Sequence, residues 1–291
     1  MQKTKNNAAR IIGAHVSAQG GFDYAAQRGK DLGVNGLQIF GASPVRWRAT
    51  LPTQKEIEKF LIARKENNIQ AVFLHAPYLI NLTSPKEALR ELSKNLLTQH
   101  LKISSALQAQ GVIFHIGSRG DMDKKTSIQI VIGAIKAIIQ AVPDGILIME
   151  NNAGAGNLVG DSLEELSEIY RGVKNNRFKI CIDTAHAFAS GMLPSFEKKN
   201  IDMFVKNFDS VIGIDAIAAF HVNDSKVEAN AKRDRHENIG EGFIGKEGIG
   251  NLINHPKFAH IPLLLEVPGF DGGGPDKRNV DIVKRLVGSN G

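Results

Sequence analysis

The sequence predicts a single-domain α/β protein folded as a (β/α)8 TIM barrel. At 291 residues the chain is long for one sandwich, but it suits one α/β barrel or two small domains. Its 42% hydrophobic and 23% charged residues are typical of a globular protein. Short β-rich runs alternate with longer amphipathic stretches about eight times, and no Pro/Ser-rich linker divides them. A doubly wound open sheet is the alternative. We expect the barrel domain to span residues 11–291, after a flexible N-terminal tail of residues 1–10.

Each unit of the barrel is expected to begin with a short strand. The eight candidate strands are residues 11–15, 36–40, 70–75, 111–115, 146–150, 179–183, 216–221 and 261–266. Helix-start patterns lie between them. Thr53 and Glu56 form a capping box, and Ser162 begins a similar pattern. Pro85, behind Ser84, is expected at the first position of another helix.

Composition and charge exclude several classes of protein. The single cysteine, Cys181, rules out a disulfide framework and a Cys-rich zinc finger. The 36 Lys and Arg outnumber the 30 Asp and Glu, a mild surplus that permits a polyanionic partner. The most apolar long run, residues 128–142, is interrupted by Lys136 and Gln140 and falls short of the roughly 18 residues of a membrane span. The polar, basic N-terminus carries no secretory pattern, so we expect a cytoplasmic protein without membrane contact.

Histidines and carboxylates recur at the carboxyl ends of the expected strands. The six positions are His75, His115, Glu150, Asp183, His221 and Glu266. One histidine beside an apolar run is usually a core or rim residue, but six such groups on six strands are hard to explain in that way. In a barrel, all strand carboxyl ends open on one face, where active sites lie. Imidazole nitrogens and carboxylate oxygens that converge there predict a first-row metal site, with zinc the leading candidate.

Two further segments add ligands of the same types. His186 follows Asp183 by three residues, in the turn behind a strand. In the long polar loop after His221, Asp234 and His236 flank an arginine; on its own this pattern would be read as a solvated loop. With the strand ends, nine candidate ligands result. Because catalytic zinc takes about three protein ligands and keeps one position open, nine ligands suit three metal ions with a bridging carboxylate.

Longer motifs surround these residues. They are H-x-x-YLINL at residues 75–82, CIDT-x-HAF at 181–188, HVNDSK at 221–226 and DRH-x-x-IGEG at 234–242. Together with IGAHVS at residues 12–17, they make the chain resemble endonuclease IV, the zinc-dependent apurinic/apyrimidinic (AP) endonuclease of base-excision DNA repair. The resemblance covers nearly the whole chain.

The resemblance implies three zinc ions per chain. The implied ligands are His75, His115 and Glu150 for the first ion; Glu150, as a bridge, with Asp183, His221 and Glu266 for the second; and His186, Asp234 and His236 for the third. Metal binding can lower the pKa of water from about 15.7 toward 7 and so supply hydroxide at neutral pH. Glu150 would orient that nucleophile, and Glu266 would limit where it can sit, so these two carboxylates are the expected catalytic residues.

The implied reaction is cleavage of the phosphodiester 5′ to an abasic site in double-stranded DNA, leaving a 3′-hydroxyl and a 5′-deoxyribose phosphate. We expect a monomer that is associated with the nucleoid when it acts. Four basic residues are expected to contact phosphates, although a solvated loop would also explain them: Lys226, Lys232, Arg233 and Arg235.

Tyr78 and Leu79 resemble the wedge that the family inserts into DNA to fill the gap left by an extruded abasic nucleotide. They could instead simply cap the mouth of the barrel. The family commonly places an inserted arginine where this chain has Val45, and an arginine, Arg46, follows one residue later. The sequence therefore leaves open which of these side chains fills the gap.

Two other functions compete with the nuclease. Metal-dependent sugar isomerases and epimerases use similar barrels, but they would need only the set of Glu150, Asp183, His221 and Glu266. The Asp-Arg-His loop would then have no role, so it favours the nuclease. A non-catalytic DNA-binding protein would explain the positive charge but would leave the converging ligands without a purpose.

Overall fold

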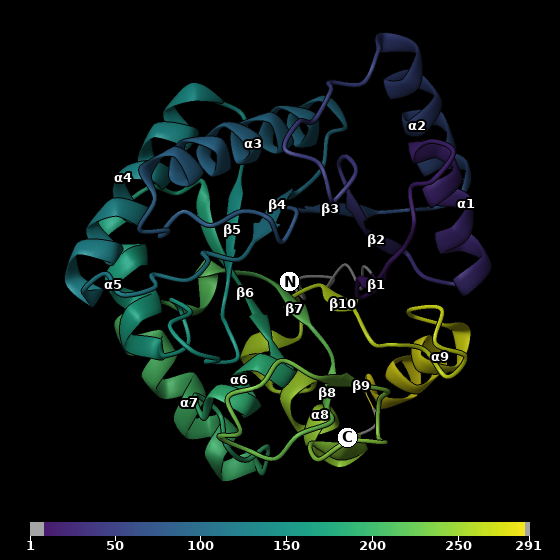
Figure 1. The fold of residues 1–291 in the computed structure, drawn as a ribbon. Helices are drawn as coiled ribbons and strands as arrows, with labels where there is room; N and C mark the ends of the chain where they lie inside the picture. The colour runs from purple at the N-terminus through teal and green to yellow at the C-terminus, as the bar shows by residue number, and fades with distance from the viewer. Residues whose placement is uncertain (1–8, 289–291) are drawn as a thin grey trace, which may run out of the picture.

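The computed structural model describes residues 9–288 of the chain. Eight parallel strands close into a barrel in the order β1-β10-β7-β6-β5-β4-β3-β2, and helices surround it (Figure 1). The barrel closes where residues 12–14 of β1 pair in register with residues 263–265 of β10. This closure confirms the single-domain TIM barrel and excludes the open sheet.

The strands lie within two residues of their expected bounds. They are β1 (Ile12–His15), β2 (Gly36–Phe40), β3 (Ala71–His75), β4 (Gly111–Phe114), β5 (Leu147–Glu150), β6 (Phe178–Asp183), β7 (Ile217–His221) and β10 (Leu263–Leu265). The short strands β8 (Asp224–Ser225) and β9 (His236–Glu237) form a separate antiparallel pair.

The α-helices follow the strands around the barrel. They are α1 (Phe22–Leu32), α2 (Gln54–Glu66), α3 (Glu87–Ala106), α4 (Lys124–Ala141), α5 (Leu163–Val173), α6 (Thr184–Ser190), α7 (Lys198–Val211), α8 (Gly245–Ile253) and α9 (Lys277–Leu286). Within residues 9–288, no helix is both long and apolar enough to cross a membrane.

Two of the three expected helix starts are confirmed. The Thr53 hydroxyl accepts a hydrogen bond from the backbone N–H of Glu56, whose carboxylate accepts one from the Thr53 N–H in return, so α2 begins with a complete capping box. Ser162 caps α5 by accepting from the N–H of Glu165.

The expected helix start at Pro85 is wrong. The helix α3 begins at Glu87, two residues later, and Lys86 is its N-cap residue. The Ser84 hydroxyl accepts a hydrogen bond from the backbone N–H of Lys86 at 3.2 Å. This local turn holds the backbone of residues 84–86 outside the helix, because serine side chains stabilise turns by bonding to the backbone two residues on.

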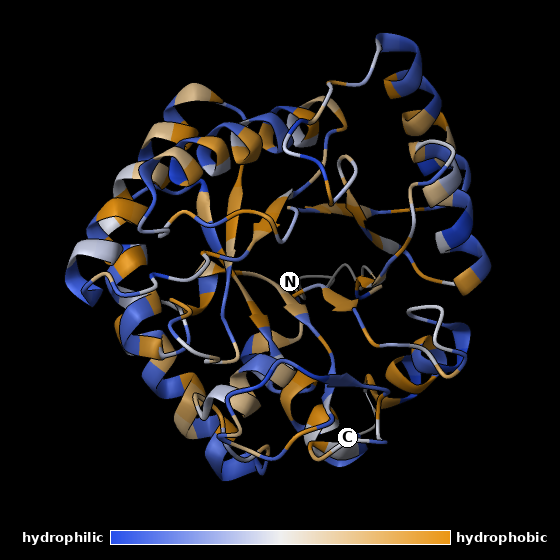
Figure 2. Ribbon diagram, viewed as in Figure 1, coloured by the Kyte–Doolittle hydropathy of each residue, from blue (hydrophilic) through white to orange (hydrophobic). Residues whose placement is uncertain are grey.

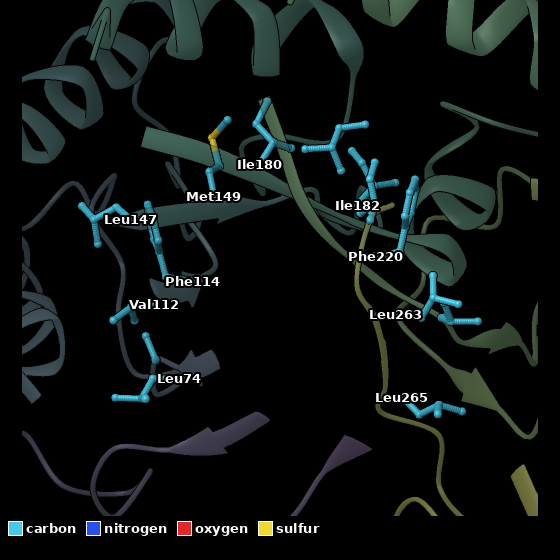
Figure 3. Close-up of a cluster of buried hydrophobic side chains, with 14 of the residues drawn as sticks. Leu74, Val112, Phe114, Leu147, Met149, Ile180, Ile182, Phe220, Leu263 and Leu265 are labelled. Atoms are coloured by element: carbon cyan, nitrogen blue, oxygen red, sulfur yellow. The ribbon is translucent and has the colours of Figure 1, made fainter. Parts of the chain in front are cut away.

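Apolar side chains fill two separate layers on either side of the barrel wall. The outer layer packs the strands against the helices, and Figure 3 shows part of it, including Leu74, Phe114 and Met149. The inner layer lies within the barrel and consists of Ala71, Phe73, Ile113, Ile148, Cys181, Ala219 and Leu264. The strands are accordingly hydrophobic along most of their length, whereas the helices alternate polar and apolar residues (Figure 2). Strands buried on both faces are what a barrel ringed by helices requires.

The expected N-terminal tail falls largely on residues 1–8, which lie outside the described part of the chain. Its last residue, Arg10, contacts the barrel. The Arg10 guanidinium donates hydrogen bonds to the backbone carbonyl oxygens of Ile253, Phe258 and Ile261. Burial lowers the pKa of this guanidinium to about 10.

Candidate metal centre

The alternation of side chains along the strands brings six of the nine expected ligands to one place. Each lies two residues beyond an inner-layer side chain, and so faces the barrel interior as well. The pairs are Phe73 and His75, Ile113 and His115, Ile148 and Glu150, Cys181 and Asp183, Ala219 and His221, and Leu264 and Glu266. Since all eight strands are parallel, these six side chains converge at the carboxyl end of the barrel.

The ligands gather in three groups, in each of which the donor atoms lie within 4.8 Å of one another. The groups are His75, His115 and Glu150; Glu150, Asp183, His221 and Glu266; and Asp183, His186 and His236. Glu150 belongs to the first two groups, and Asp183 to the last two. These two carboxylates therefore connect the three groups into one cluster.

The first group centres on one oxygen of Glu150. Its Oε2 lies 3.1 Å from Nε2 of His75 and 3.4 Å from Nε2 of His115. The other oxygen, Oε1, lies 3.0 Å from Nδ1 of His221, which belongs to the second group. His221 Nδ1 is also 3.1 Å from Oε2 of Glu266 and 3.9 Å from Oδ2 of Asp183. The two oxygens of Glu150 thus face different groups.

The third group joins α6 to the β8–β9 segment. Nε2 of His186 and Nε2 of His236 are 3.3 Å apart, and Oδ1 of Asp234 lies 3.2 Å and 3.3 Å from them. Oδ2 of Asp183 lies 3.6 Å from His236 Nε2. Asp234 therefore joins the group that the sequence assigns to it.

These separations suit zinc. Two ligand atoms at about 2.0–2.1 Å from a tetrahedral zinc ion are about 3.3–3.4 Å from each other. The closest contacts within the three groups, 3.0 to 3.4 Å, lie near this value. The donor set of imidazole nitrogens and carboxylate oxygens is also one that zinc accepts. The residues present therefore fit a group of bound zinc ions.

Asp183 and His186 meet because of a helix start. Oδ1 of Asp183 caps α6 by accepting a hydrogen bond from the backbone N–H of His186 at 2.8 Å. The cap fixes Asp183 at the end of β6 and places His186 on the first turn of the helix. The second oxygen of Asp183 remains directed at the cluster, where it accepts a hydrogen bond from the Asn223 amide at 2.6 Å.

The β8–β9 segment, which carries Asp234 and His236, is held by a buried carboxylate. Asp224 accepts hydrogen bonds from five backbone N–H groups, those of Ser225, Gly240, Gly242, Ile244 and Gly245. At Gly242 a Cβ would lie 2.6 Å from Asp224 Oδ1 and 2.4 Å from the Ser225 carbonyl oxygen, so only glycine fits. Asp224 therefore determines the path of the chain both before Asp234 and after His236.

Three of the five histidines have their second ring nitrogen beside a backbone carbonyl oxygen. These contacts join Nδ1 of His75 to Ala76 O at 2.7 Å, Nδ1 of His186 to Asn151 O at 3.0 Å, and Nδ1 of His236 to Glu266 O at 3.3 Å. A carbonyl oxygen only accepts, so each Nδ1 carries the hydrogen. Each Nε2 is then left with a lone pair directed at the cluster, as in histidines that bind metals.

The buried charges of the cluster stabilise one another. Burial alone would raise the pKa of Glu150, but the imidazoles of His115 and His221 hold it well below its ordinary value. Burial alone would lower the pKa of His186, but the carboxylates of Asp183 and Asp234 hold it well above its ordinary value. Carboxylates so placed favour a positive charge at the centre of the cluster, which bound divalent ions would supply.

A cavity of about 1420 Å3 opens over the cluster. His75, His115, His186, His236 and Glu266 contribute to its walls, whereas Glu150, Asp183 and His221 are fully buried. The cavity is large enough for a bulky substrate to reach the exposed side of the ligand groups. The fully buried ligands lie beyond the reach of solvent.

The expected DNA wedge lies on the rim of this cavity. Tyr78, in the loop between β3 and α3, is 66% exposed and lines the cavity, and Leu79 beside it is half-buried. Val45, in the loop between β2 and α2, is 68% exposed, and Arg46 is exposed as well. Both loops therefore offer side chains at the surface.

The expected phosphate contacts differ in their surroundings. Lys226 and Arg235 are exposed and lie on the segment that carries the third group. Lys232 instead donates a hydrogen bond to the backbone carbonyl oxygen of Ser190 at 2.6 Å. Its ammonium group thus holds the last residue of α6, where cations are favoured because free carbonyl groups end the helix.

Two residues of the site were not recognised in the sequence. His15 ends β1 as His75 ends β3, and its Nδ1 lies 3.2 Å from Oε1 of Glu266. Its position at the end of an expected strand could have revealed it. Gln38 of β2 is fully buried and contacts His221 and Glu266. An amide is not a typical metal ligand, and so nothing in the sequence singled it out.

Comparisons with known proteins identify the family of this chain. Residues 26–286 match a family model described as xylose isomerase-like TIM barrel. A "Probable endonuclease 4" from Halothermothrix orenii is 36% identical to this chain over 94% of its length and 99% of the relative's. Another from Natranaerobius thermophilus is 34% identical over 95% and 98%. The chain belongs to the endonuclease IV family.

Solved structures support the same placement. The crystal structure of endonuclease IV from Thermus thermophilus matches with a TM-score of 0.84 and 27% identity, over 96% of this chain and 99% of that one. A D-tagatose 3-epimerase-like protein matches with a TM-score of 0.71 and 18% identity, over 95% and 96% of the two chains, and shares the fold alone. The resemblance to endonuclease IV expected from the sequence is therefore confirmed.

Proposed function

We propose that the protein is a zinc-dependent AP endonuclease that hydrolyses the phosphodiester 5′ to abasic sites in duplex DNA, leaving a 3′-hydroxyl and a 5′-deoxyribose phosphate. The observation that carries the proposal is the third group, in which His186, Asp234 and His236 come within 3.3 Å of one another in a member of the endonuclease IV family. A sugar isomerase would need only the group of four that contains Glu150 and Glu266.

The nine proposed ligands would hold three zinc ions, with Glu150 and Asp183 shared between neighbouring groups. Bound zinc would act as a Lewis acid on the phosphate and lower the pKa of water, which provides a nucleophile at neutral pH. The lone pairs directed inward from His75, His186 and His236 support this assignment.

The two proposed catalytic carboxylates differ in exposure, and this suits different roles. Glu150 is fully buried between four imidazoles, so it can orient a water molecule only from below the cavity floor. The Glu266 side chain is 17% exposed and lines the cavity, so it borders the space where a water molecule and the phosphate would meet. We propose that Glu150 orients the nucleophilic water molecule and that Glu266 restricts where this water molecule can lie.

DNA would contact the rim of the cavity. Extruding an abasic nucleotide costs less than flipping an intact one, because it stacks poorly. Tyr78 and Leu79, with Arg46 from the neighbouring loop, would fill the gap in the stack, and the exposed cations of Lys226 and Arg235 would contact phosphates beside the third group. We propose that a monomer suffices, because all nine ligands come from one chain.

The deciding experiment uses a duplex with a single tetrahydrofuran abasic analogue, incubated with the purified protein before and after chelation and after zinc is restored. A matched duplex with an intact nucleotide is the control. We expect a break only at the analogue, with a 3′-hydroxyl end, that chelation abolishes and zinc restores. An intact duplex, or a metal-dependent epimerisation of ketoses in a parallel assay, would overturn the proposal.

A further inference from the structure

Gln38 is a buried amide that contacts two of the proposed ligands at once. Its Oε1 lies 2.7 Å from Nε2 of His221, and its Nε2 donates a hydrogen bond to Oε1 of Glu266. The side chain is fully buried. In the barrel wall Gln38 pairs with His15 of β1 and with Phe73 of β3, one layer below His75, and its long side chain reaches His221 and Glu266 from there.

The chemistry of its neighbours fixes the orientation of this amide. If the amide were turned over, its oxygen would face the Glu266 carboxylate, and two acceptors would lie in contact without a hydrogen between them. In the orientation observed, the Gln38 oxygen accepts and its nitrogen donates. His221 must then carry its hydrogen on Nε2. In the neutral ring, the form that can bind a metal, the lone pair then lies on Nδ1, the atom that is 3.0 Å from Glu150 and 3.1 Å from Glu266.

Because of the same amide, the two oxygens of Glu266 have different contacts. Oε1 accepts a hydrogen bond from Gln38 and lies 3.2 Å from Nδ1 of His15. Oε2 is left facing His221 Nδ1. One side chain thus determines which atom of His221 and which atom of Glu266 point at the centre of the group.

We infer that Gln38 is a positioning residue of the second ligand group, which sets the tautomer of His221 and the rotation of Glu266 before a metal binds. The inference rests on the proposed function, since it concerns the binding of metal by this group. Residues that orient metal ligands through such hydrogen bonds typically contribute 10–100-fold to metal affinity or activity. Replacing Gln38 should therefore weaken the binding of one of the three metal ions and lower kcat, although no ligand is replaced.

The test compares Gln38→Met, which keeps the length of the side chain but removes both hydrogen bonds, with Gln99→Met as the matched control. Gln99 lies on α3, and its Oε1 accepts a hydrogen bond from the backbone N–H of Ala49 at 2.8 Å. Metal retained per chain is measured against a series of chelator concentrations, together with kcat, KM and the Tm of the metal-free proteins.

We expect Gln38→Met to lose one metal equivalent at a chelator concentration roughly 10–100-fold lower than the wild type requires, with a lower kcat and a nearly unchanged KM. The Tm of its metal-free form should match that of Gln99→Met. Wild-type retention of all metals by Gln38→Met overturns the inference and leaves the proposed function standing. A wild-type protein that binds no metal overturns the proposed function itself.

Gln38→Glu provides a second measurement if Gln38→Met does not fold. A glutamate here still accepts from His221 Nε2, but it places a carboxylate oxygen against Glu266 in place of the N–H donor. We expect this variant, too, to lose one metal equivalent more readily than the wild type. Unaltered metal retention in Gln38→Glu would contradict the role assigned to the amide nitrogen.

Discussion

His186 and His236 point their Nε2 atoms at each other across 3.3 Å, from α6 and from β9. Their Nδ1 atoms face backbone carbonyl oxygens, so each Nε2 presents a lone pair to the other. Two lone pairs at this distance repel unless a proton or a cation lies between them. Despite burial, Asp183 and Asp234 hold the pKa of His186 well above its ordinary value, so a proton on His186 can relieve the repulsion in the metal-free protein, and a bound cation would take its place.

The first prediction concerns the number of metal ions. Elemental analysis of metal-replete protein should give close to three zinc ions per chain, because nine ligands form three groups. His236→Ala should lower the count by about one and leave the fold intact. His260→Ala should leave the count unchanged, because His260 is exposed and precedes β10, whereas the proposed ligand Glu266 follows the other end of that strand. One or two ions in fully active wild-type protein would refute the three-metal assignment.

The second prediction concerns Glu150 and Glu266. Replacing either by glutamine keeps its shape but removes a negative charge from the cluster. We expect kcat on abasic DNA to fall by about 10²–10⁴-fold, the usual effect of removing a catalytic group, with DNA binding largely kept. Glu247→Gln, on the surface of α8, serves as the control. Cleavage by Glu150→Gln at the wild-type rate would disprove the assigned role.

The convergence of the six strand-end side chains could be predicted because a strand has a period of two. An apolar residue that faces the interior, such as Phe73, dictates that His75 faces it too. The alternation cannot reveal Gln38, since an amide in a strand resembles any other polar residue until its neighbours are known. Likewise, the hydrogen bonds that organise the β8–β9 segment come from backbone groups, and Asp224 alone gives no indication of them in the sequence.

The third prediction separates the DNA wedge from the chemistry. Tyr78→Ala removes an exposed aromatic ring, and base–aromatic stacking is worth about 1–3 kcal/mol per base. We expect weaker binding to abasic duplex and slower cleavage at sub-saturating substrate, with the same metal count.

Because Val45 stands where the resemblance led us to expect an inserted arginine, the same assay on Arg46→Ala tests which loop fills the gap. A fluorescent base opposite the abasic site reports insertion. If neither substitution alters binding or fluorescence, the two loops only form the lip of the barrel.

The fourth prediction concerns His100 of α3. This histidine is fully buried, and within the described part of the chain neither ring nitrogen has a hydrogen-bond partner. Burial, aided by the nearby His75, lowers the pKa of His100 from 6.5 to about 4. Between these values the unfolded chain binds the proton and the folded chain does not, so His100 reduces stability as the pH falls from 7 to 4.

His100→Leu removes this effect. Urea unfolding of the metal-free proteins should show that the free energy of unfolding of the variant rises relative to that of the wild type as the pH falls, by up to about 3 kcal/mol at pH 4. It should also be about 1 kcal/mol more stable at pH 7, since a buried unpaired polar group is lost. A stability difference that does not change with pH would rule out a buried neutral histidine here.

The fifth prediction concerns Asp224. An asparagine in its place would turn one acceptor oxygen into a donor that faces backbone N–H groups such as that of Gly245. We expect Asp224→Asn to lower the free energy of unfolding by about 1–3 kcal/mol and to weaken metal retention by the third group selectively. Asp281→Asn, on the surface of α9, is the control. If Asp224→Asn folds and binds the third metal ion as tightly as the wild type does, other contacts must hold the segment.

The five N–H groups that donate to Asp224 all belong to residues 225–245, the segment that also carries Asp234 and His236. The hydrogen bonds of Asp224 therefore stabilise this segment from within. The segment is also tied to the end of α6, where the N–H groups of Asn230 and Lys232 donate to the carbonyl oxygens of Phe188 and Ala189. On its other side it is tied to Asn279 of α9, which accepts from the N–H of Ile239 and donates to the side chain of Asn238. The smallest unit that can be transplanted into a related barrel is therefore this segment together with α6 and Asn279. Transplanting the Asp-Arg-His triplet alone would transfer two proposed ligands without the hydrogen bonds that position them.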